Sequence, residues 1–224
     1  MGILVGMRAL FPLFVLLVTA QACAPVFSEM QSARMLDQGQ MEATALYSNV
    51  GFGEDGESDH VQNQLGARVS YGFSDQFNLR FGYENLFEDG GSIHVIGLGA
   101  KFPIIQDRIA AFVPIGTALG EDISTADNWQ VQPTLLFTVP LGDNFEFNPS
   151  TKWVRPFDTD QEGLVAFNFG AGVSSNINQW AIRPEIGLLY NPGESGHFTH
   201  YSVGFSFNPF YEDDCCPQKL RRNR

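Results

Sequence analysis

Apolar and polar side chains alternate along most of the chain after residue 40. In the clearest example, residues 180–190 (WAIRPEIGLLY), every second residue is apolar or aromatic, while the positions between them include Arg183 and Glu185. A period of two is typical of a β-strand, because successive side chains point to opposite faces of the sheet. One face here is continuously bulky and apolar and the other is charged, an arrangement typical of a strand in a transmembrane barrel.

The alternation recurs in ten segments. They cover residues 40–48, 61–73, 77–87, 92–103, 109–119, 129–141, 145–155, 164–174, 180–190 and 198–207. Most are at least as long as the roughly 9–11 residues that a tilted strand needs to cross a bilayer. Short turns alternate with mostly longer, acid-rich loops that contain no Lys or Arg. We therefore predict an all-β fold over residues 40–210, a closed antiparallel up-and-down transmembrane β-barrel of about ten strands.

Prolines interrupt this pattern. Each proline inside a strand removes one hydrogen bond of the ladder, and a closed barrel has no edge strand that could tolerate the loss. We expect bulges or shifted strand boundaries at these positions, which are Pro114, Pro133, Pro149 and Pro184.

Assigning the more apolar face of each strand to lipid leaves nine charged residues facing inward. They are Glu42, Arg68, Arg80, Glu84, Lys101, Glu146, Lys152, Arg183 and Glu185. An unpartnered buried ion costs several kcal/mol, so the near balance of bases and acids predicts an ion-pair network in the lumen, with inward glycines making room for it. Side chains just fill barrels of about eight strands, and open channels need about sixteen, so we expect a charged lumen that is closed or nearly closed.

A soluble ligand-binding barrel of the lipocalin type is an alternative interpretation of the same alternation. It requires the apolar face of each strand to point inward. In a membrane that orientation would place the bases against lipid, at a cost of about 2–4 kcal/mol each near the midplane. The opposite orientation removes this cost and is the one we favour.

The ends of the chain carry separate signals. Residues 1–22 are typical of a secretory signal peptide, with Arg8 followed by a short apolar run. Residues 19–23 (TAQAC) resemble the lipobox of bacterial lipoproteins, which implies lipid attachment at Cys23; ordinary cleavage near Ala22 is the alternative. We interpret residues 23–39, which show no periodicity, as a periplasmic linker. Residues 211–224 are interpreted as a periplasmic basic tail, and we assign no role to its adjacent Cys215 and Cys216.

One short cluster of residues is similar to a catalytic motif. His200-Tyr201-Ser202 is similar to the His-x-Ser of outer-membrane lipid A deacylases, in which His acts as a base on a Ser nucleophile. In the favoured orientation both side chains point into the lumen, whereas a deacylase must present them to lipid. We therefore expect no catalytic residues and keep a barrel-embedded lipid hydrolase as the alternative. The sequence shows no metal or cofactor motif, so we expect neither, and a net charge of -12 argues against nucleic acid as a partner.

Together these features resemble the small bacterial outer-membrane β-barrel proteins of the OmpX and OmpW general type. Ser202, Gly204, Phe205 and Phe207 match the assembly signal in the last strand of that family, although Asn208-Pro209 and the polar tail depart from it. The resemblance implies a place in the bacterial outer membrane, contact with its lipid and lipopolysaccharide, and insertion by the barrel assembly machinery. It also implies a structural, surface-interaction or narrow-transport role, and it leaves the oligomeric state open.

Overall fold

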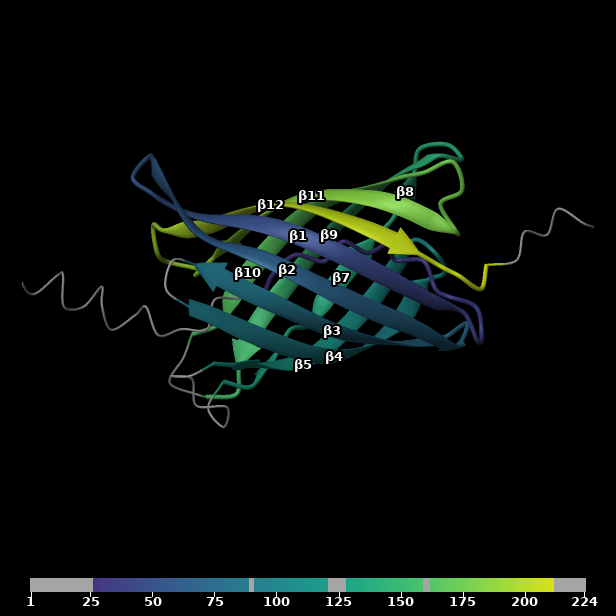
Figure 1. The fold of residues 1–224 in the computed structure, drawn as a ribbon, viewed down its shortest axis with the longest axis horizontal. Coiled ribbons are helices and arrows are strands. Elements are labelled where there is room, and N and C mark those ends of the chain that lie inside the picture. The colour runs from purple at the N-terminus through teal and green to yellow at the C-terminus, as the bar shows by residue number, and fades with distance from the viewer. Residues whose placement is uncertain (1–25, 89–90, 121–127, 159–161, 212–224) are drawn as a thin grey trace, which may run out of the picture.

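A single sheet closes on itself to form a barrel (Figure 1) in this computed structural model, which describes residues 26–88, 91–120, 128–158 and 162–211. The strands are β1 (Met41–Glu54), β2 (Glu57–Ser74), β3 (Phe77–Glu88), β4 (Gly91–Ile105), β5 (Ile109–Leu119), β6 (Gln130–Val131), β7 (Thr134–Phe137), β8 (Val139–Pro140), β9 (Phe145–Pro156), β10 (Leu164–Val173), β11 (Trp180–Tyr190) and β12 (His197–Phe207).

The ring closes because the last strand pairs with the first. β12 runs antiparallel to β1 from Ala43↔Phe207 to Gly53↔His197. The short strands β6, β7 and β8 lie end to end and together fill one place beside β9, so the described chain has ten strand positions. The predicted closed antiparallel barrel of about ten strands is confirmed.

Two parts of the sheet differ from the predicted strands. β1 and β2 extend well into the expected loop, because Asp55 and Gly56 both adopt positive φ (51° and 87°). Positive φ at both central residues is the geometry of a tight type I′ turn, which lets the two strands continue as one long hairpin. The strand expected at residues 129–141 is instead broken into β6, β7 and β8.

Each of the four prolines lies at a gap in the pairing. Pro133 separates β6 from β7, and Pro114 lies where the pairing of β5 passes from β6 to β7. Pro149 lies between the residues of β9 that pair with β7 and those that pair with β8. Near Pro184 the β10–β11 register skips from Gly170↔Glu185 to Val173↔Ile182. These gaps follow from the missing N–H of proline.

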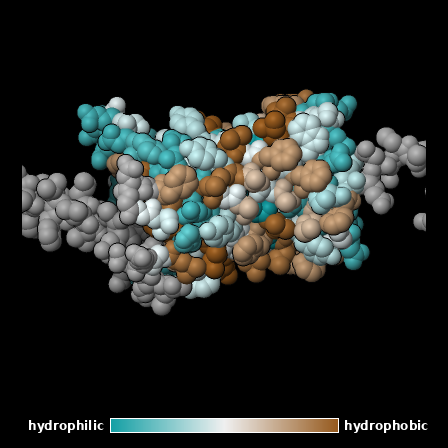
Figure 2. Space-filling model, in the orientation of Figure 1, coloured by the Kyte–Doolittle hydropathy of each residue, from teal (hydrophilic) through white to brown (hydrophobic). Residues whose placement is uncertain are grey.

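The outer surface of the barrel is apolar. Leu65, Leu98, Phe169 and Val203 point outward, and each has roughly half of its surface exposed. Figure 2 shows hydrophobic residues mainly over the middle of the barrel and hydrophilic residues gathered towards its two ends. An apolar belt between polar ends is the surface of a barrel in lipid. It is the reverse of the orientation that the soluble lipocalin-like alternative requires.

No helix among the described residues is long and apolar enough to cross a membrane.

The N-terminal stretch lies inside the barrel. Residues 26–36, here called the lumen segment, are buried from 26 to 33 and partly buried from 34 to 36. Phe27 packs against Val50 and Leu189, which lie near the end of the barrel with the longer connections, here called the loop end. The Met35 N–H donates to Asp107 in the β4–β5 turn, at the opposite turn end. The lumen segment therefore runs along the barrel axis before the chain turns back into β1.

This placement corrects the interpretation of residues 23–39 as a periplasmic linker for residues 26–36, while residues 23–25 lie outside the described part of the chain. The lumen segment lies in the barrel because inward-facing side chains bind its backbone and inward glycines leave space for it. The expected signal peptide, Cys23 and most of the basic tail, with Cys215 and Cys216, lie outside the described residues.

Candidate functional site: the occupied lumen

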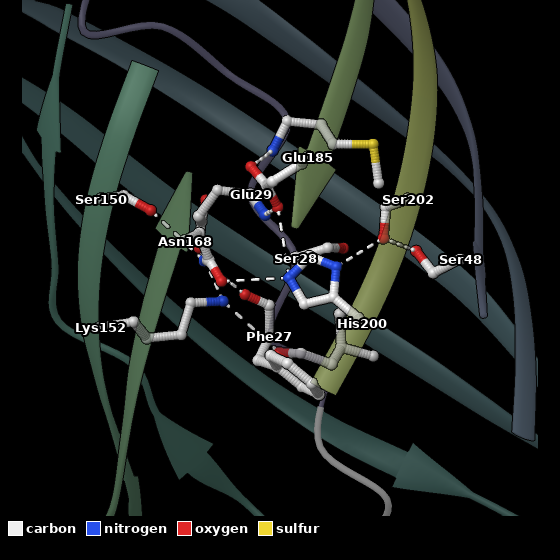
Figure 3. A network of polar contacts seen from close by, with 12 residues as sticks. Phe27, Ser28, Glu29, Ser48, Ser150, Lys152, Asn168, Glu185, His200 and Ser202 are labelled. Atoms are coloured by element: carbon white, nitrogen blue, oxygen red, sulfur yellow. Dashed lines mark hydrogen bonds and ion pairs between the residues drawn. The ribbon is translucent and has the colours of Figure 1, made fainter. Parts of the chain in front are cut away.

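Wall side chains bind the main chain of the lumen segment at its centre (Figure 3). The carboxylate of Glu185 on β11 accepts hydrogen bonds from the backbone N–H groups of Glu29 (2.7 Å) and Met30 (2.8 Å). Asn168 on β10 donates from Nδ2 to the carbonyl oxygen of Phe27 (2.8 Å). The segment therefore has a fixed position along the barrel axis.

Basic side chains surround Glu29 of the lumen segment. Lys152 Nζ on β9 lies 2.6 Å from Glu29 Oε1, and both side chains are almost fully buried. Arg68 on β2 donates from Nη1 to the Glu29 carbonyl oxygen (2.7 Å), and its Nε donates to Glu84 Oε1 (2.9 Å). Arg80 on β3 also reaches the Glu29 carbonyl oxygen, at 3.4 Å. Lys152 and Glu29 are thus paired, as are Arg68 and Glu84, whereas Arg80 contacts only a carbonyl oxygen among the described residues.

A second group of charges lies nearer the turn end. Glu146 on β9 is fully buried and accepts from Arg183 Nη1 (3.0 Å) and from Arg34 Nε of the lumen segment (2.7 Å). Arg183 also lies 3.6 Å from Glu42. Lys101 on β4 donates from Nζ to the carbonyl oxygen of Arg34 (2.7 Å). This group of charges holds the half of the lumen segment that is nearer the turn end.

The nine inward charges predicted from the sequence divide into two sets in the structure. Arg68 pairs with Glu84, and Arg183 joins Glu42 to Glu146. Arg68 and Glu146 of this set also contact the lumen segment, and so do the other four, which are Arg80, Lys101, Lys152 and Glu185. Sequence reasoning missed the partners on the segment itself, which include Phe27, Glu29, Met30 and Arg34. The signal that could have indicated them is the number of inward glycines, which leave more space than nine long side chains fill.

His200 and Ser202 on β12 point into the lumen, as the favoured orientation predicted. His200 Nδ1 lies 2.6 Å from Ser202 Oγ, and Ser202 Oγ lies 2.7 Å from Ser48 Oγ. His200 Nε2 lies 3.1 Å from Asn168 Oδ1, which can only accept, so Nε2 carries a proton. Phe27 of the lumen segment packs edge-on against the imidazole, with ring centroids 4.7 Å apart.

This arrangement does not favour the hydrolase alternative. His200 is 1% exposed and Ser202 is 9% exposed, and both lie on the opposite side of the wall from lipid. A substrate acyl chain in the membrane could not reach Ser202 Oγ through the strand. In this geometry the two side chains act as part of the polar filling of the lumen.

The part of the chain that the structure describes holds no group of three or more His, Cys, Asp or Glu placed to bind a metal ion.

Comparisons with known proteins add structural likeness only. No protein family and no curated protein matches the sequence. Among solved structures, the chain resembles the translocator domain of the autotransporter NalP from Neisseria meningitidis, with 10% identity and a TM-score of 0.42, over 89% of this chain and 95% of that one. It also resembles the KdgM porin (10%, 0.43, 74% and 98%) and Ail, the attachment invasion locus protein of Yersinia pestis (12%, 0.36, 76% and 99%).

Structural similarity this low does not indicate a function. The architecture is assigned from the strand pairing and the surface of the chain itself. Closed antiparallel barrels with an apolar belt are the spanning structures of the bacterial outer membrane. The chain is an outer-membrane β-barrel. The finer resemblance to the OmpX and OmpW type and the lipoprotein signal stay predictions.

Proposed function

We propose that this outer-membrane barrel does not conduct and has a structural or surface-interaction role, with its lumen closed by residues 26–36. The observation that carries the proposal is the anchoring of the lumen segment at Glu29. Its backbone N–H is bound by Glu185, and its carboxylate is paired with Lys152. Removing one partner of a buried ion pair costs about 3–5 kcal/mol, so these contacts oppose withdrawal of the segment.

The loop end supports the surface-interaction part of this role. The β1–β2 hairpin projects beyond the rest of the barrel at that end (Figure 1). It carries four exposed acidic residues and a turn that holds them together; the acids are Glu54, Asp55, Glu57 and Asp59. A cluster of one charge sign raises the local concentration of oppositely charged partners. A basic or cationic partner fits this hairpin best.

Contact with outer-membrane lipid and lipopolysaccharide, and insertion by the barrel assembly machinery, belong to the same proposal. The apolar belt supports the first, because it requires lipid around the barrel. Lipid attachment at Cys23 also stays a prediction, which mass spectrometry of the mature protein from outer membranes tests.

Conductance in a planar lipid bilayer tests the closed lumen. The wild-type barrel should give no steady single-channel current. A release variant, Glu29→Ala with Glu185→Ala, removes the two carboxylates that anchor the segment at Glu29 and should give step-like currents. The matched control, Glu57→Ala with Asp59→Ala, removes two acids from the exposed hairpin and should stay silent. The heat-dependent gel shift of folded barrels verifies that each protein is folded.

Two outcomes contradict the proposal. Steady currents from the wild-type protein would favour the second candidate, narrow transport, which the cavity beside β3, β4 and β5 supports. A folded release variant that stays silent would show that the lumen segment is not what closes the barrel.

A further inference from the structure

A cavity remains in the lumen beside the lumen segment. It is bounded by β3, β4 and β5, with Gly82, Gly97 and Ile115 on its walls, and by Glu29 of the segment. It offers about 80 Å³ to the centres of water molecules. One water needs roughly 10–15 Å³ by the same measure, so there is room for several waters or for one ligand of a few heavy atoms.

Arg80 lines this cavity and has no acidic partner among the described residues. Its side chain is 5% exposed, and its Nη1 reaches only the Glu29 carbonyl oxygen, at 3.4 Å. Its Nε and Nη2 are buried and have no hydrogen-bond partner among the described residues. These two nitrogens form the edge of a guanidinium that binds a carboxylate or phosphate with two parallel hydrogen bonds.

The charges around the cavity leave a surplus of one base. The acids on its walls, Glu84 and Glu29, are paired with Arg68 and Lys152. Arg80 is the remaining charged residue on these walls. A buried charge without a counter-charge costs several kcal/mol, and a bound anion would remove that cost.

A second unpaired atom restricts the kind of anion. Glu84 Oε2 is buried and has no hydrogen-bond partner among the described residues. A carboxylate oxygen can only accept, so a ligand that satisfies it must donate. An oxyanion that keeps a hydroxyl group has both the acceptors for Arg80 and a donor for Glu84, whereas chloride has no donor.

Two glycines keep the cavity open. A Cβ at Gly97 would lie 3.5 Å from its nearest neighbour, the carbonyl oxygen of Ile115. At Gly82 it would lie 3.6 Å from Arg68 Cγ. Both are ordinary contact distances, so neither position is glycine for lack of space. Without these side chains, the guanidinium of Arg80 has room to turn its free edge towards a ligand.

We propose that this cavity binds one small oxyanion that carries a hydroxyl group, inorganic phosphate being the simplest, with Arg80 as its main ligand. Arg68 and Lys152 add positive potential, and Glu84 accepts the hydroxyl proton in a hydrogen bond. The proposal does not depend on whether the barrel conducts.

Calorimetric titration of the folded, detergent-solubilised barrel in phosphate-free buffer tests the site. Phosphate should bind saturably with one site per chain, acetate more weakly, and chloride without detectable saturation. Arg80→Gln should weaken phosphate binding at least about tenfold, because both parallel hydrogen bonds are lost. Gly97→Val leaves every charge in place but puts a side chain into the cavity, and it should weaken binding to a similar degree.

Arg108→Gln is the matched control, because it removes one positive charge from an exposed side chain in the β4–β5 turn. It should bind phosphate as the wild type does. If Arg80→Gln does not fold, Gly97→Val decides the question. The proposal is overturned if folded wild-type protein shows no saturable phosphate binding, if chloride binds as tightly as phosphate, or if a folded Arg80→Gln or Gly97→Val variant keeps wild-type affinity.

Discussion

The inward glycines of β11 and β12 and two glycines beside the cavity, Gly82 and Gly97, are there for opposite reasons. On the side of β11 and β12, glycines lie where other groups already fill the space. A Cβ at Gly204 would lie 2.9 Å from the sulfur of Met30, and a Cβ at Gly187 would collide with the side chains of Asn168 and His200. On the side of β3 and β4, a Cβ at Gly97 would meet nothing closer than 3.5 Å.

The pairing of charges follows the same division. On the filled side, Glu185 binds two N–H groups of the lumen segment, and Glu146 accepts from Arg183 and Arg34. On the hollow side, Arg80 has a single long hydrogen bond to a carbonyl oxygen. A row of inward glycines in a barrel sequence can therefore mark either a place for a segment of the chain or a place for a ligand.

The largest expected effect comes from removing one base that has an acidic partner and one that has none. Lys152→Met leaves the buried carboxylate of Glu29 without its basic partner and should lower the free energy of unfolding by about 3–5 kcal/mol. Arg80→Met removes a buried charge that has no acidic partner among the described residues, so it should raise the free energy of unfolding in phosphate-free buffer. Urea unfolding in lipid vesicles, followed by tryptophan fluorescence, measures both.

A control strengthens that comparison. Adding Glu29→Gln to Lys152→Met removes the unpaired carboxylate and should recover part of the lost free energy of unfolding. Equal destabilisation by Lys152→Met and Arg80→Met would show that the two bases do not differ in charge pairing.

A smaller effect is expected nearer the turn end. Arg183→Leu takes one of two partners from the buried Glu146, which keeps Arg34. The free energy of unfolding should fall by about 2–3 kcal/mol. This lies at or below the lower end of the range of about 3–5 kcal/mol for breaking a buried ion pair, because Glu146 keeps one basic partner. Arg108→Leu, at an exposed turn position, should stay within about 0.5 kcal/mol of wild type. An Arg183→Leu barrel as stable as this control would mean that Glu146 needs only Arg34.

The smallest effects come from adding one methyl group on each side. Gly187→Ala forces Asn168 and His200 to move and should cost about 1–3 kcal/mol. Gly97→Ala meets no such obstacle and should stabilise the strand by about 0.5–1 kcal/mol, since Ala loses less backbone entropy than Gly. Thermal or urea unfolding of the two variants side by side measures the difference. Similar costs at both positions would remove the distinction between a filled and a hollow side.

The barrel wall was predictable from the sequence because strands in a membrane obey a strict period of two. Residues 109–119 and 180–190 were predicted with the bounds that β5 and β11 have. The charges that cannot face lipid also set the inward face, so the positions of Arg183 and His200 followed. The predicted strand bounds were wrong where proline or turn geometry determines the backbone: Pro133 breaks a strand, and Asp55-Gly56 extends a hairpin.

The lumen segment was not predictable in this way. The wall binds it largely through main-chain groups, such as the N–H groups of Glu29 and Met30 and the carbonyl oxygen of Phe27. Every residue type carries these groups, so the contacts leave no pattern in the side chains. Pairing of Lys152 and Glu185 with residues more than 120 positions away was likewise hidden, because no local period connects them.

The path of the lumen segment has a mechanical consequence. At the turn end, the backbone of Gly39 is hydrogen-bonded to that of Gly72, and the chain then reverses into β1. Tension applied to Val26 from the loop end would act along the barrel axis, parallel to the segment and across its hydrogen bonds. Contacts of Glu29, Arg34 and the neighbouring backbone would then be loaded together instead of one after another. The barrel should therefore resist extraction of its own N-terminal stretch by force far better than it would resist peeling of a surface strand.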